Sequence, residues 1–404
     1  MSSHGIQRLQ SVPVLMYHSV GVPNHKWIWK FLTIPYRIFE DHLRMLKRKK
    51  FNTIDLLRLY SYRSNAEPIP PNSIVLTFDD GYLDNWVYAY PLLKKYGFKG
   101  TIFVNPEFVD PTEDYRTNLE DVWAGKVRLQ ELISHGFLSW REMREMEKGG
   151  VMDIQSHGMT HTWYFTGSEI IDFRHPGDPY VWMNWNKDTN RKHKYLSKNQ
   201  EDLVELGGPV YQHEKSLEAR RYYPDQCLDK TLVDYVKANG GKEFFKNKSW
   251  REELFQVVED YKSKNTLKDR YETDEEQLKR LHWELKESKL ILEHRLEKEI
   301  RHFCWPGGGY TSQSRNIANE YYLSTTLGSR DQSLNRNTPG EDAKDIKRMA
   351  VNFIEGRNDG TVRYLSGYYH YLCIRKFRGE TERNLLRKAL KGVALLKYRY
   401  IPWD

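Results

Sequence analysis

Two adjacent carboxylates, Asp79 and Asp80, stand near the end of the segment SIVLTFDDG (73–81). The apolar run before them predicts a strand that is buried on both faces. Two negative charges side by side at the end of a buried strand are costly unless a cation or a shared proton relieves them. The alternative is a polar loop in which one aspartate caps the next helix. The dipeptide alone leaves both interpretations open.

A second segment, VMDIQSHGMTH (151–161), also ends in residues that bind metals. His157 and His161 are four residues apart, a spacing that presents two imidazoles on one side of a helical turn, as zinc sites require. With Asp80 they form a set of two histidines and one carboxylate, each just past a strand end. Three protein ligands leave one coordination position open for water or substrate, as hydrolysis needs. Asp79 is then placed beside the metal as a general base.

At this point the sequence resembles a known family. TFDDG (77–81) followed by SHGMTH (156–161) is similar to the first two motifs of the polysaccharide deacetylases, carbohydrate esterase family 4. FCWPGGGY (303–310) resembles the family's strand-end motif, which contains a proline flanked by aromatic residues. The resemblance spans roughly residues 11–161 and 286–355. It implies a distorted (β/α) barrel, a divalent metal, for which zinc is expected, and removal of N- or O-acetyl groups from sugars.

The third motif carries further roles by the same resemblance. In the family, the backbone N–H just after the proline helps to bind the oxyanion, and the matching position here is Gly307. Trp305, Pro306 and Tyr310 are expected to contact the substrate. Family members usually carry a tyrosine at the Gly307 position, and some carry an arginine upstream that orients the base. Neither residue is in register in this sequence.

No clean motif near the C-terminus supplies the family's general acid, a histidine that protonates the leaving amine. His18 is the first candidate because it ends a predicted strand, 12–18, on the same side as the carboxylates. His370 is the second candidate. A histidine at a strand end is more often a structural residue than a catalyst, and this alternative stays open.

The order of predicted elements favours the same fold. Expected strands are residues 12–18, 53–54, 74–76, 101–105, 151–157, 301–305, 323–327 and 349–351, with helices near 39–46, 83–96 and 140–148. Strands that alternate with helices indicate parallel βα units. In barrels the carboxyl ends of the strands carry the chemistry, and the candidate residues above fall there. We therefore expect a distorted (β/α) barrel of about seven parallel strands, formed by residues 1–161 and 286–355.

The alternation of strands and helices stops in residues 162–285, because no strand pattern is evident there. Helices are expected near 230–239, 249–263 and 273–301. Long insertions in compact domains are usually lids or binding surfaces, so we expect a mostly helical insertion that faces the substrate. Trp182 and Trp185 are candidates for stacking on sugar rings. A solvated insertion that only packs on the barrel, with both tryptophans in its core, is an equal alternative.

The remaining C-terminal tail, residues 356–404, contains a basic amphipathic segment, 383–398. Such a helix can lie on an anionic membrane surface. The alternative is a helix that docks on the barrel and exposes its basic face to solvent, which is the commoner arrangement for such helices.

The composition limits the partners and the compartment. The formal net charge is +8, from 63 basic and 55 acidic residues, and the basic residues are spread along the chain. Nucleic acid is therefore not an expected partner. The first thirty residues do not read as a signal peptide, and no apolar run is long enough to span a membrane. From these features we expect a cytoplasmic protein, with membrane association through the tail as an option.

The sequence thus predicts a metal-dependent hydrolase that removes acetyl groups, N-acetyl groups first, from a glycan or from a lipid-linked or nucleotide sugar precursor. One alternative is a catalytically inactive glycan-binding relic of the same fold, which would be expected to have lost metal ligands. Another is a metal hydrolase that cleaves a different carbon–nitrogen, ester or glycosidic bond. Glycosidic cleavage usually needs two carboxylates that flank the bond.

Overall fold

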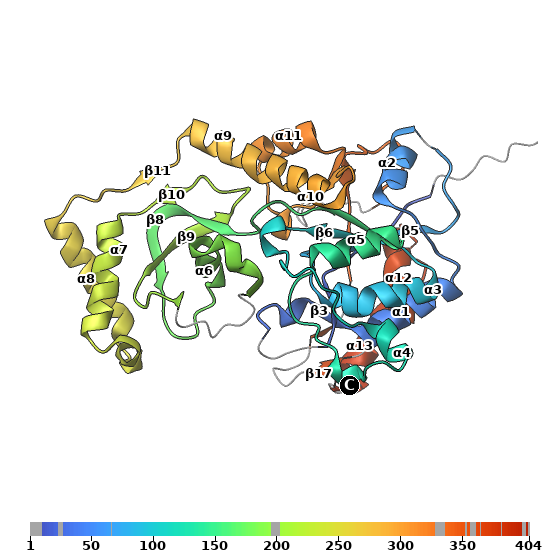
Figure 1. The fold of residues 1–404 in the computed structure, drawn as a ribbon, viewed down its shortest axis with the longest axis horizontal. Coiled ribbons are helices and arrows are strands. Elements are labelled where there is room, and N and C mark those ends of the chain that lie inside the picture. The colour runs from blue at the N-terminus through green and yellow to red at the C-terminus, as the bar shows by residue number, and fades with distance from the viewer. Residues whose placement is uncertain are drawn as a thin grey trace, which may run out of the picture.

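The fold is built on a parallel sheet of nine strands (Figure 1). Its order is β14 (Asp345–Ile346), β13 (Ser324–Thr326), β12 (His302–Phe303), β7 (Met152–Ser156), β6 (Gly100–Val104), β5 (Ser73–Phe78), β1 (Val14–Tyr17) and β15 (Met349–Ala350), with β4 (Asn52–Thr53) paired to β5. Within the described residues no pairing joins β14 to β15, so the barrel is open there. The expected distorted (β/α) barrel is confirmed, with more strands than the seven or so expected.

The computed structural model describes residues 10–22, 27–65, 67–194, 203–327, 336–351, 354–355, 361–363, 365–380, 382–397 and 401–402. None of the helices in these ranges combines the length and the hydrophobicity that a bilayer-spanning segment requires. The cytoplasmic location expected from the sequence stays a prediction.

The carboxyl ends of the parallel strands meet at one edge of the sheet. All six residues of β5 are buried, as its apolar sequence predicts. Pairing continues one residue past the strands: the backbone N–H groups of Asp79, His157 and Cys304 donate to carbonyls of β1, β6 and β7 at 3.0, 2.9 and 2.9 Å. Backbone hydrogen bonds therefore fix the positions of these three residues relative to the sheet.

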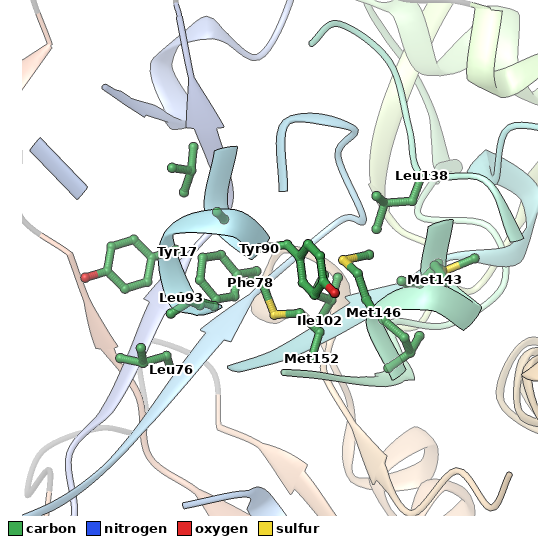
Figure 2. Packing of buried hydrophobic residues seen from close by; sticks show 14 of the residues in the cluster. Tyr17, Leu76, Phe78, Tyr90, Leu93, Ile102, Leu138, Met143, Met146 and Met152 are labelled. Carbon is green, nitrogen blue, oxygen red and sulfur yellow. The ribbon is translucent and has the colours of Figure 1, made fainter. Parts of the chain in front are cut away.

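Helices cover the outer face of the sheet and enclose the main core (Figure 2). They include α1 (Tyr36–Arg48), α3 (Tyr90–Tyr96) and α5 (Trp140–Lys148). α3 ends at Gly97, which has a left-handed φ of 72°. Ser139 and Glu142 form a capping box at the start of α5. Figure 2 shows Met146 of α5 packed near Met152 of the sheet.

The charged helix expected at 273–301 is a continuous run of α9 (Asp274–His282), a π-helical segment (Trp283–Glu287) and α10 (Ser288–Leu296). Four of its leucines are buried in the same core as the sheet: Leu281, Leu285, Leu292 and Leu296. Leu278, near the start of the same helix, is 42% exposed. The helix therefore packs as a barrel helix that leads into β12, and the expected boundary at residue 285 falls inside it.

The insertion is not mostly helical, and the expectation that it lacks strands is wrong. A long antiparallel hairpin joins β8 (Trp163–Phe173) to β9 (Pro209–Lys215), and β10 (Tyr222–Tyr223) pairs with β11 (Arg270–Tyr271). Three helices accompany them: α6 (Val181–Lys187), α7 (Gln226–Ala238) and α8 (Trp250–Lys264). Phe173 of the hairpin shares a separate core with leucine and valine side chains of α7 and α8. Figure 1 shows α7 and α8 on the side away from the sheet.

The C-terminal segment contains two helices, α12 (Gly367–Phe377) and α13 (Asn384–Lys397). Ile374 of α12 joins the main core, and the helix packs against α1. α13 packs on α12. The expected amphipathic helix is thus present, except that Tyr398 lies outside the described residues.

The leucines of α10 test whether this helix belongs to the barrel core. Leu292→Ala is expected to lower the free energy of unfolding by about 2–5 kcal/mol, because the side chain is fully buried among barrel residues. Leu290→Ala is the matched control, since Leu290 is 45% exposed on the same helix, and it should change stability by no more than about 0.5 kcal/mol. Chemical denaturation measures both values. Equal effects of the two substitutions would contradict the packing described here.

Candidate active site

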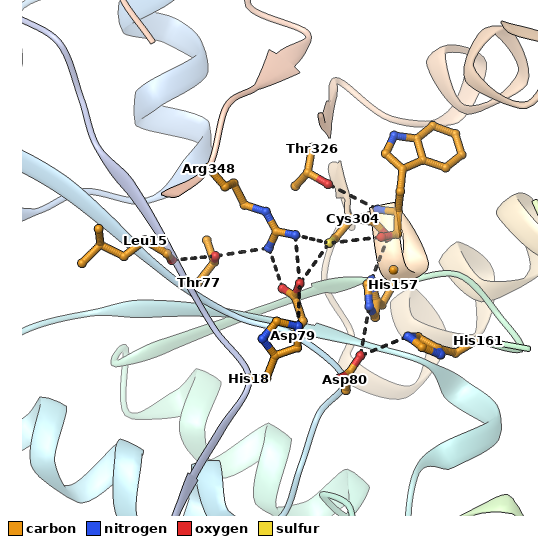
Figure 3. Close-up of polar contacts among 12 residues, drawn as sticks. Leu15, His18, Thr77, Asp79, Asp80, His157, His161, Cys304, Thr326 and Arg348 are labelled. Carbon is orange, nitrogen blue, oxygen red and sulfur yellow. Dashed lines mark hydrogen bonds and ion pairs between the residues drawn. The ribbon is translucent and has the colours of Figure 1, made fainter. Parts of the chain in front are cut away.

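Three potential metal ligands converge at the carboxyl edge of the sheet (Figure 3). Oδ1 of Asp80 lies 3.1 Å from Nε2 of His157 and 3.3 Å from Nε2 of His161. Asp80 and His161 both adopt left-handed backbone conformations, with φ of 73° and 43°, which residues with side chains rarely take up. Such strain is typical of functional sites, where the surrounding structure holds it in place.

Neighbouring groups fix His157 with one ring nitrogen toward Asp80. Nδ1 of His157 lies 2.8 Å from the backbone carbonyl of Cys304, to which it donates when it carries the proton. This hydrogen bond leaves the lone pair of Nε2 free for a metal, the usual arrangement for a ligating histidine. The side-chain amide of Asn105, which follows β6, donates to the carbonyl of His157 at 2.5 Å. The backbone of the ligand loop is therefore tied to β6 as well as to β12.

His161 is held through its neighbour Thr160. The backbone N–H and the hydroxyl of Thr160 donate to Oε1 of Glu284 at 3.0 and 2.7 Å. Lys192 of the insertion donates to the carbonyl of Thr160 at 2.7 Å and pairs with Glu107 at 2.5 Å. Lys192 and Glu284 are 0% and 1% exposed. The loop that carries His161 thus sits between two buried charged side chains.

The donor set fits a divalent cation such as zinc. Two imidazole nitrogens and one carboxylate oxygen lie close enough to share one ion, and this combination is common in hydrolytic zinc sites. Burial alone would raise the pKa of Asp80, but hydrogen bonds from both histidines hold it well below its ordinary value. An anionic carboxylate in this position suits a metal ligand.

The carboxylate of Asp79 lies beside these ligands and pairs with Arg348 (Figure 3). The guanidinium makes a bidentate pair with the Asp79 carboxylate, at 2.6 and 2.9 Å. Burial alone would raise the pKa of Asp79, but the charges of Arg348, His18 and His157 lower it below its ordinary value. Nε2 of His18 lies 3.8 Å from Oδ2 of Asp79. Asp79 is therefore an ionised, positioned carboxylate next to the ligand set.

Arg348 contacts the carboxylate that is predicted to be the base, although the sequence shows no arginine in register with the family pattern. It directly precedes β15, whereas sequence reasoning looked for it upstream of the third motif. The contact joins residues 269 positions apart in the chain. The guanidinium also lies 3.0 Å from the sulfur of Cys304.

A cavity of about 350 Å³ opens over these residues. His18, Asp79, Asp80, His157, His161 and Arg348 line its floor. Its walls are largely aromatic, formed by Trp29, Phe31, Tyr82, Phe108, Phe137, Trp163 and Trp305. A polar floor beneath apolar, flat walls suits a ligand with a reactive polar group and hydrocarbon faces, such as an acetylated sugar.

A model of the polysaccharide deacetylase family matches residues 66–241, which include both the DDG and the SHGMTH segments. Over these residues, which are less than half of the chain, the sequence is similar to the polysaccharide deacetylase family. The resemblance inferred from the motifs is thereby confirmed.

Two curated relatives are similar to this chain over part of its length. YxkH of Bacillus subtilis (strain 168), whose name places it among the polysaccharide deacetylases, is 30% identical over 151 residues, or 37% of this chain and 43% of that protein. A poly-beta-1,6-N-acetyl-D-glucosamine N-deacetylase of Staphylococcus aureus (strain MRSA252) is 26% identical over 163 residues, or 40% of this chain and 47% of that protein. The chain thus matches less than half of the length of each.

Among solved structures, the deacetylase domain of BpsB from Bordetella bronchiseptica is similar with a TM-score of 0.50. The match covers 84% of this chain and 96% of that chain at 19% sequence identity. At this level of identity the similarity supports the barrel fold and says nothing further about the substrate.

The structure places the expected residues of the third motif at the cavity only in part. Trp305 and Gly307 line the cavity, whereas Pro306 and Tyr310 are not among the described residues that line it. The ring of Tyr310 packs on Trp305 at a centroid distance of 4.9 Å. Tyr310 therefore supports Trp305 from behind, and the roles of all four residues stay predictions.

Trp182 and Trp185 are placed in a core, and the expectation that they contact sugar is wrong. They are 7% and 2% exposed, in an aromatic cluster with Phe108 and Phe137. Trp185 packs behind the cavity wall, 5.1 Å from Phe108. Part of the aromatic wall that sequence reasoning missed comes from the N-terminal loop and the start of β8, which supply Trp29, Phe31 and Trp163. The clustered tryptophans and phenylalanines of both segments were the available signal.

His370, the second candidate for the general acid, is also excluded by its position. It is 2% exposed and stacks on His42 at 3.9 Å, between α12 and α1. Burial holds its pKa well below the ordinary value. His18 is the candidate that reaches the cavity.

The ligand assignment predicts the metal content of three variants. Asp80→Ala and His157→Ala should each lose bound metal, because each removes one of three donors that converge on one point. Asp79→Asn is the matched control and should keep the metal, since Asp79 faces Arg348 instead. Inductively coupled plasma mass spectrometry gives the stoichiometry, and circular dichroism shows whether each variant is folded. Wild-type metal content in both alanine variants would contradict the site.

Proposed function

We propose that this protein is a metal-dependent deacetylase that hydrolyses the N-acetyl group of an amino sugar in a glycan or glycan precursor. The observation that carries the proposal is the Asp80, His157 and His161 donor set beside an arginine-held carboxylate, at the floor of an aromatic cavity. The family match supports deacetylation of a glycan. The name of the Staphylococcus aureus relative supports an N-acetylated glucosamine polymer as the substrate class.

The proposed reaction adds water to the acetyl carbonyl carbon and breaks the carbon–nitrogen bond, which gives acetate and a free amine. Asp80, His157 and His161 would hold a zinc ion or another divalent cation, which would supply a Lewis acid for the carbonyl and lower the pKa of the attacking water. Asp79 accepts a proton from that water. Arg348 keeps Asp79 ionised and fixes its direction.

Two further groups complete the proposal. The backbone N–H of Gly307 stabilises the negative charge that develops on the acetyl oxygen, as the family motif implies. His18 delivers a proton to the leaving nitrogen, which would otherwise depart as an unstable anion. Its side chain lines the cavity next to Asp79 and is 22% exposed, so substrate and solvent protons can reach it.

The alternatives are less well supported. An inactive glycan-binding relic would have no need of the three donors and the positioned base, all of which are present. A retaining or inverting glycosidase needs two carboxylates on either side of the scissile bond, whereas Asp79 and Asp80 are adjacent and each is engaged by cationic or nitrogen partners. Hydrolysis of another carbon–nitrogen or ester bond can be distinguished from deacetylation by its product, because only deacetylation releases acetate.

The decisive experiment measures acetate release from a panel of N-acetylated oligosaccharides, O-acetylated sugars, nucleotide sugars and lipid-linked sugars. Release from N-acetylated oligosaccharides, lost on chelation of the metal and restored by zinc, is the expected result. An enzyme that releases no acetate from any member of the panel, with metal bound, would overturn the proposed function.

The assignment of Asp79 as the base makes a separate prediction. Asp79→Asn should lower kcat roughly 10²- to 10⁴-fold, the usual contribution of general-base catalysis. It should retain the metal, and some stability should be lost because the buried guanidinium of Arg348 loses its charged partner. Kinetics and metal content on one preparation measure this. A variant that keeps its rate, or one that loses the metal, would exchange the roles of Asp79 and Asp80.

The aromatic wall predicts an effect on substrate binding. Phe31 lines the cavity and is 52% exposed, so its ring is available to stack on a sugar. Phe31→Ala should raise KM roughly fivefold, as expected for the loss of about 1 kcal/mol of stacking. Phe255→Ala on α8 is the matched control, because Phe255 is 38% exposed and its ring contacts Phe173 in the insertion instead of the cavity. Equal KM values in both variants would remove Phe31 from the binding site.

A further inference from the structure

α13 presents an apolar face that the rest of the described structure does not cover. Leu385 and Leu396 are 82% and 89% exposed, and Leu386 and Val393 are 42% and 47% exposed. Together with the exposed Ala389 they recur at intervals of three and four residues, so they lie along one side of the helix. Large aliphatic side chains with this exposure, aligned over about three turns, mark an interaction surface.

The opposite side of α13 fixes the helix to the protein. Leu390 and the buried Ala394 pack on Tyr369 and Cys373 of α12. Arg387 donates to the hydroxyl of Tyr369 at 3.5 Å. Because α12 itself packs on α1, the exposed apolar face is held in a defined position on the barrel.

The positive charge of the segment from Arg383 to Arg399 indicates which kind of partner the exposed apolar face can bind. From Arg383 to Arg399 the sequence contains six basic residues and no acidic residue. Lys388 and Lys391 are exposed and, three residues apart, lie on a side of the helix next to the apolar face. A second copy of the same helix would bring like charges together, which disfavours self-association. A surface that offers both negative charge and hydrocarbon matches the two faces at once.

We propose that α13 is a peripheral membrane anchor that lies in the plane of an anionic lipid bilayer. Its leucines enter the boundary between headgroups and acyl chains, and its lysine and arginine side chains contact the lipid phosphates. The Leu390 and Ala394 face stays on α12, so the barrel remains attached while the helix binds. This inference goes beyond the proposed function and holds whichever bond the active site cleaves.

Vesicle co-sedimentation of the full chain tests the anchor. Wild-type protein should bind vesicles of phosphatidylcholine mixed with phosphatidylglycerol, and bind phosphatidylcholine alone far more weakly. Leu385→Gln combined with Leu396→Gln should weaken binding to the mixed vesicles roughly a hundredfold, about tenfold for each leucine removed from the bilayer. Lys388→Gln combined with Lys391→Gln should reduce the preference for the anionic lipid.

Leu290→Gln on α10 is the matched control, because that leucine is 45% exposed on a different face of the fold. It should leave vesicle binding unchanged. Melting temperatures show that each variant is folded, as expected for exposed positions. Wild-type protein that binds neither vesicle, or a double leucine variant that binds as wild type does, would overturn the proposal. Self-association that depends on Leu385 and Leu396, without vesicle binding, would also overturn it. Acetate release from a soluble oligosaccharide should be unchanged in these variants, so failure of the anchor and failure of the proposed function are distinguishable.

Discussion

The main constraint on the site is the burial of two adjacent carboxylates, which must keep their negative charges with little access to solvent. Asp79 and Asp80 are 3% and 7% exposed, and burial favours the neutral form of each. Each therefore needs a positive partner or several hydrogen-bond donors to remain an anion. The chain turns at Asp80, where φ is 73°, and different side chains bond the two carboxylates. Arg348 forms an ion pair with Asp79, and the two histidines, with the proposed cation, stabilise the charge of Asp80.

The topology of the sheet supplies those partners. β5 lies between β1, which His18 directly follows, and β6, and β7 beyond β6 brings His157 to the same edge. Cys304 follows β12 and Arg348 precedes β15, five strand positions apart in the sheet order. In a flat sheet this separation would be about 24 Å, yet their side chains are 3.0 Å apart. The curvature of the barrel is therefore what brings Arg348 and the third motif to the same carboxylate.

Sequence analysis found the site residues that lie in short local motifs and missed the residue that only the tertiary fold brings to the site. The two aspartates and the two histidines lie in short segments next to strand ends, and their spacing and context were sufficient to find them. Arg348 stands in no motif, and only the closure of β1 against β15 brings it to Asp79. Most barrel strands were predictable because each is an apolar run bounded by polar residues.

The insertion was predicted less well for physical reasons that can be identified. β8 pairs with β9 through irregular register shifts, so the strict alternation that reveals a half-buried strand is broken. Trp182 and Trp185 lie in a polar-looking stretch, and an indole suits a core as well as a sugar-binding surface. Nothing in the local sequence distinguishes the two environments, since the cluster that buries them is formed by side chains from the N-terminal loop and from residues 108 and 137.

The insertion nevertheless takes part in the geometry of the site, through Lys192 and not through Trp182 and Trp185. Thr160 precedes His161, and its carbonyl, N–H and hydroxyl are bonded by Lys192 on one side and Glu284 on the other. His161 adopts a left-handed backbone conformation, which needs such external restraint to persist. A buried ammonium and a buried carboxylate with several partners are costly to displace. The loop bearing His161 is therefore rigid because the insertion is folded, and the orientation of the third ligand is coupled to a segment that lies outside the barrel strands.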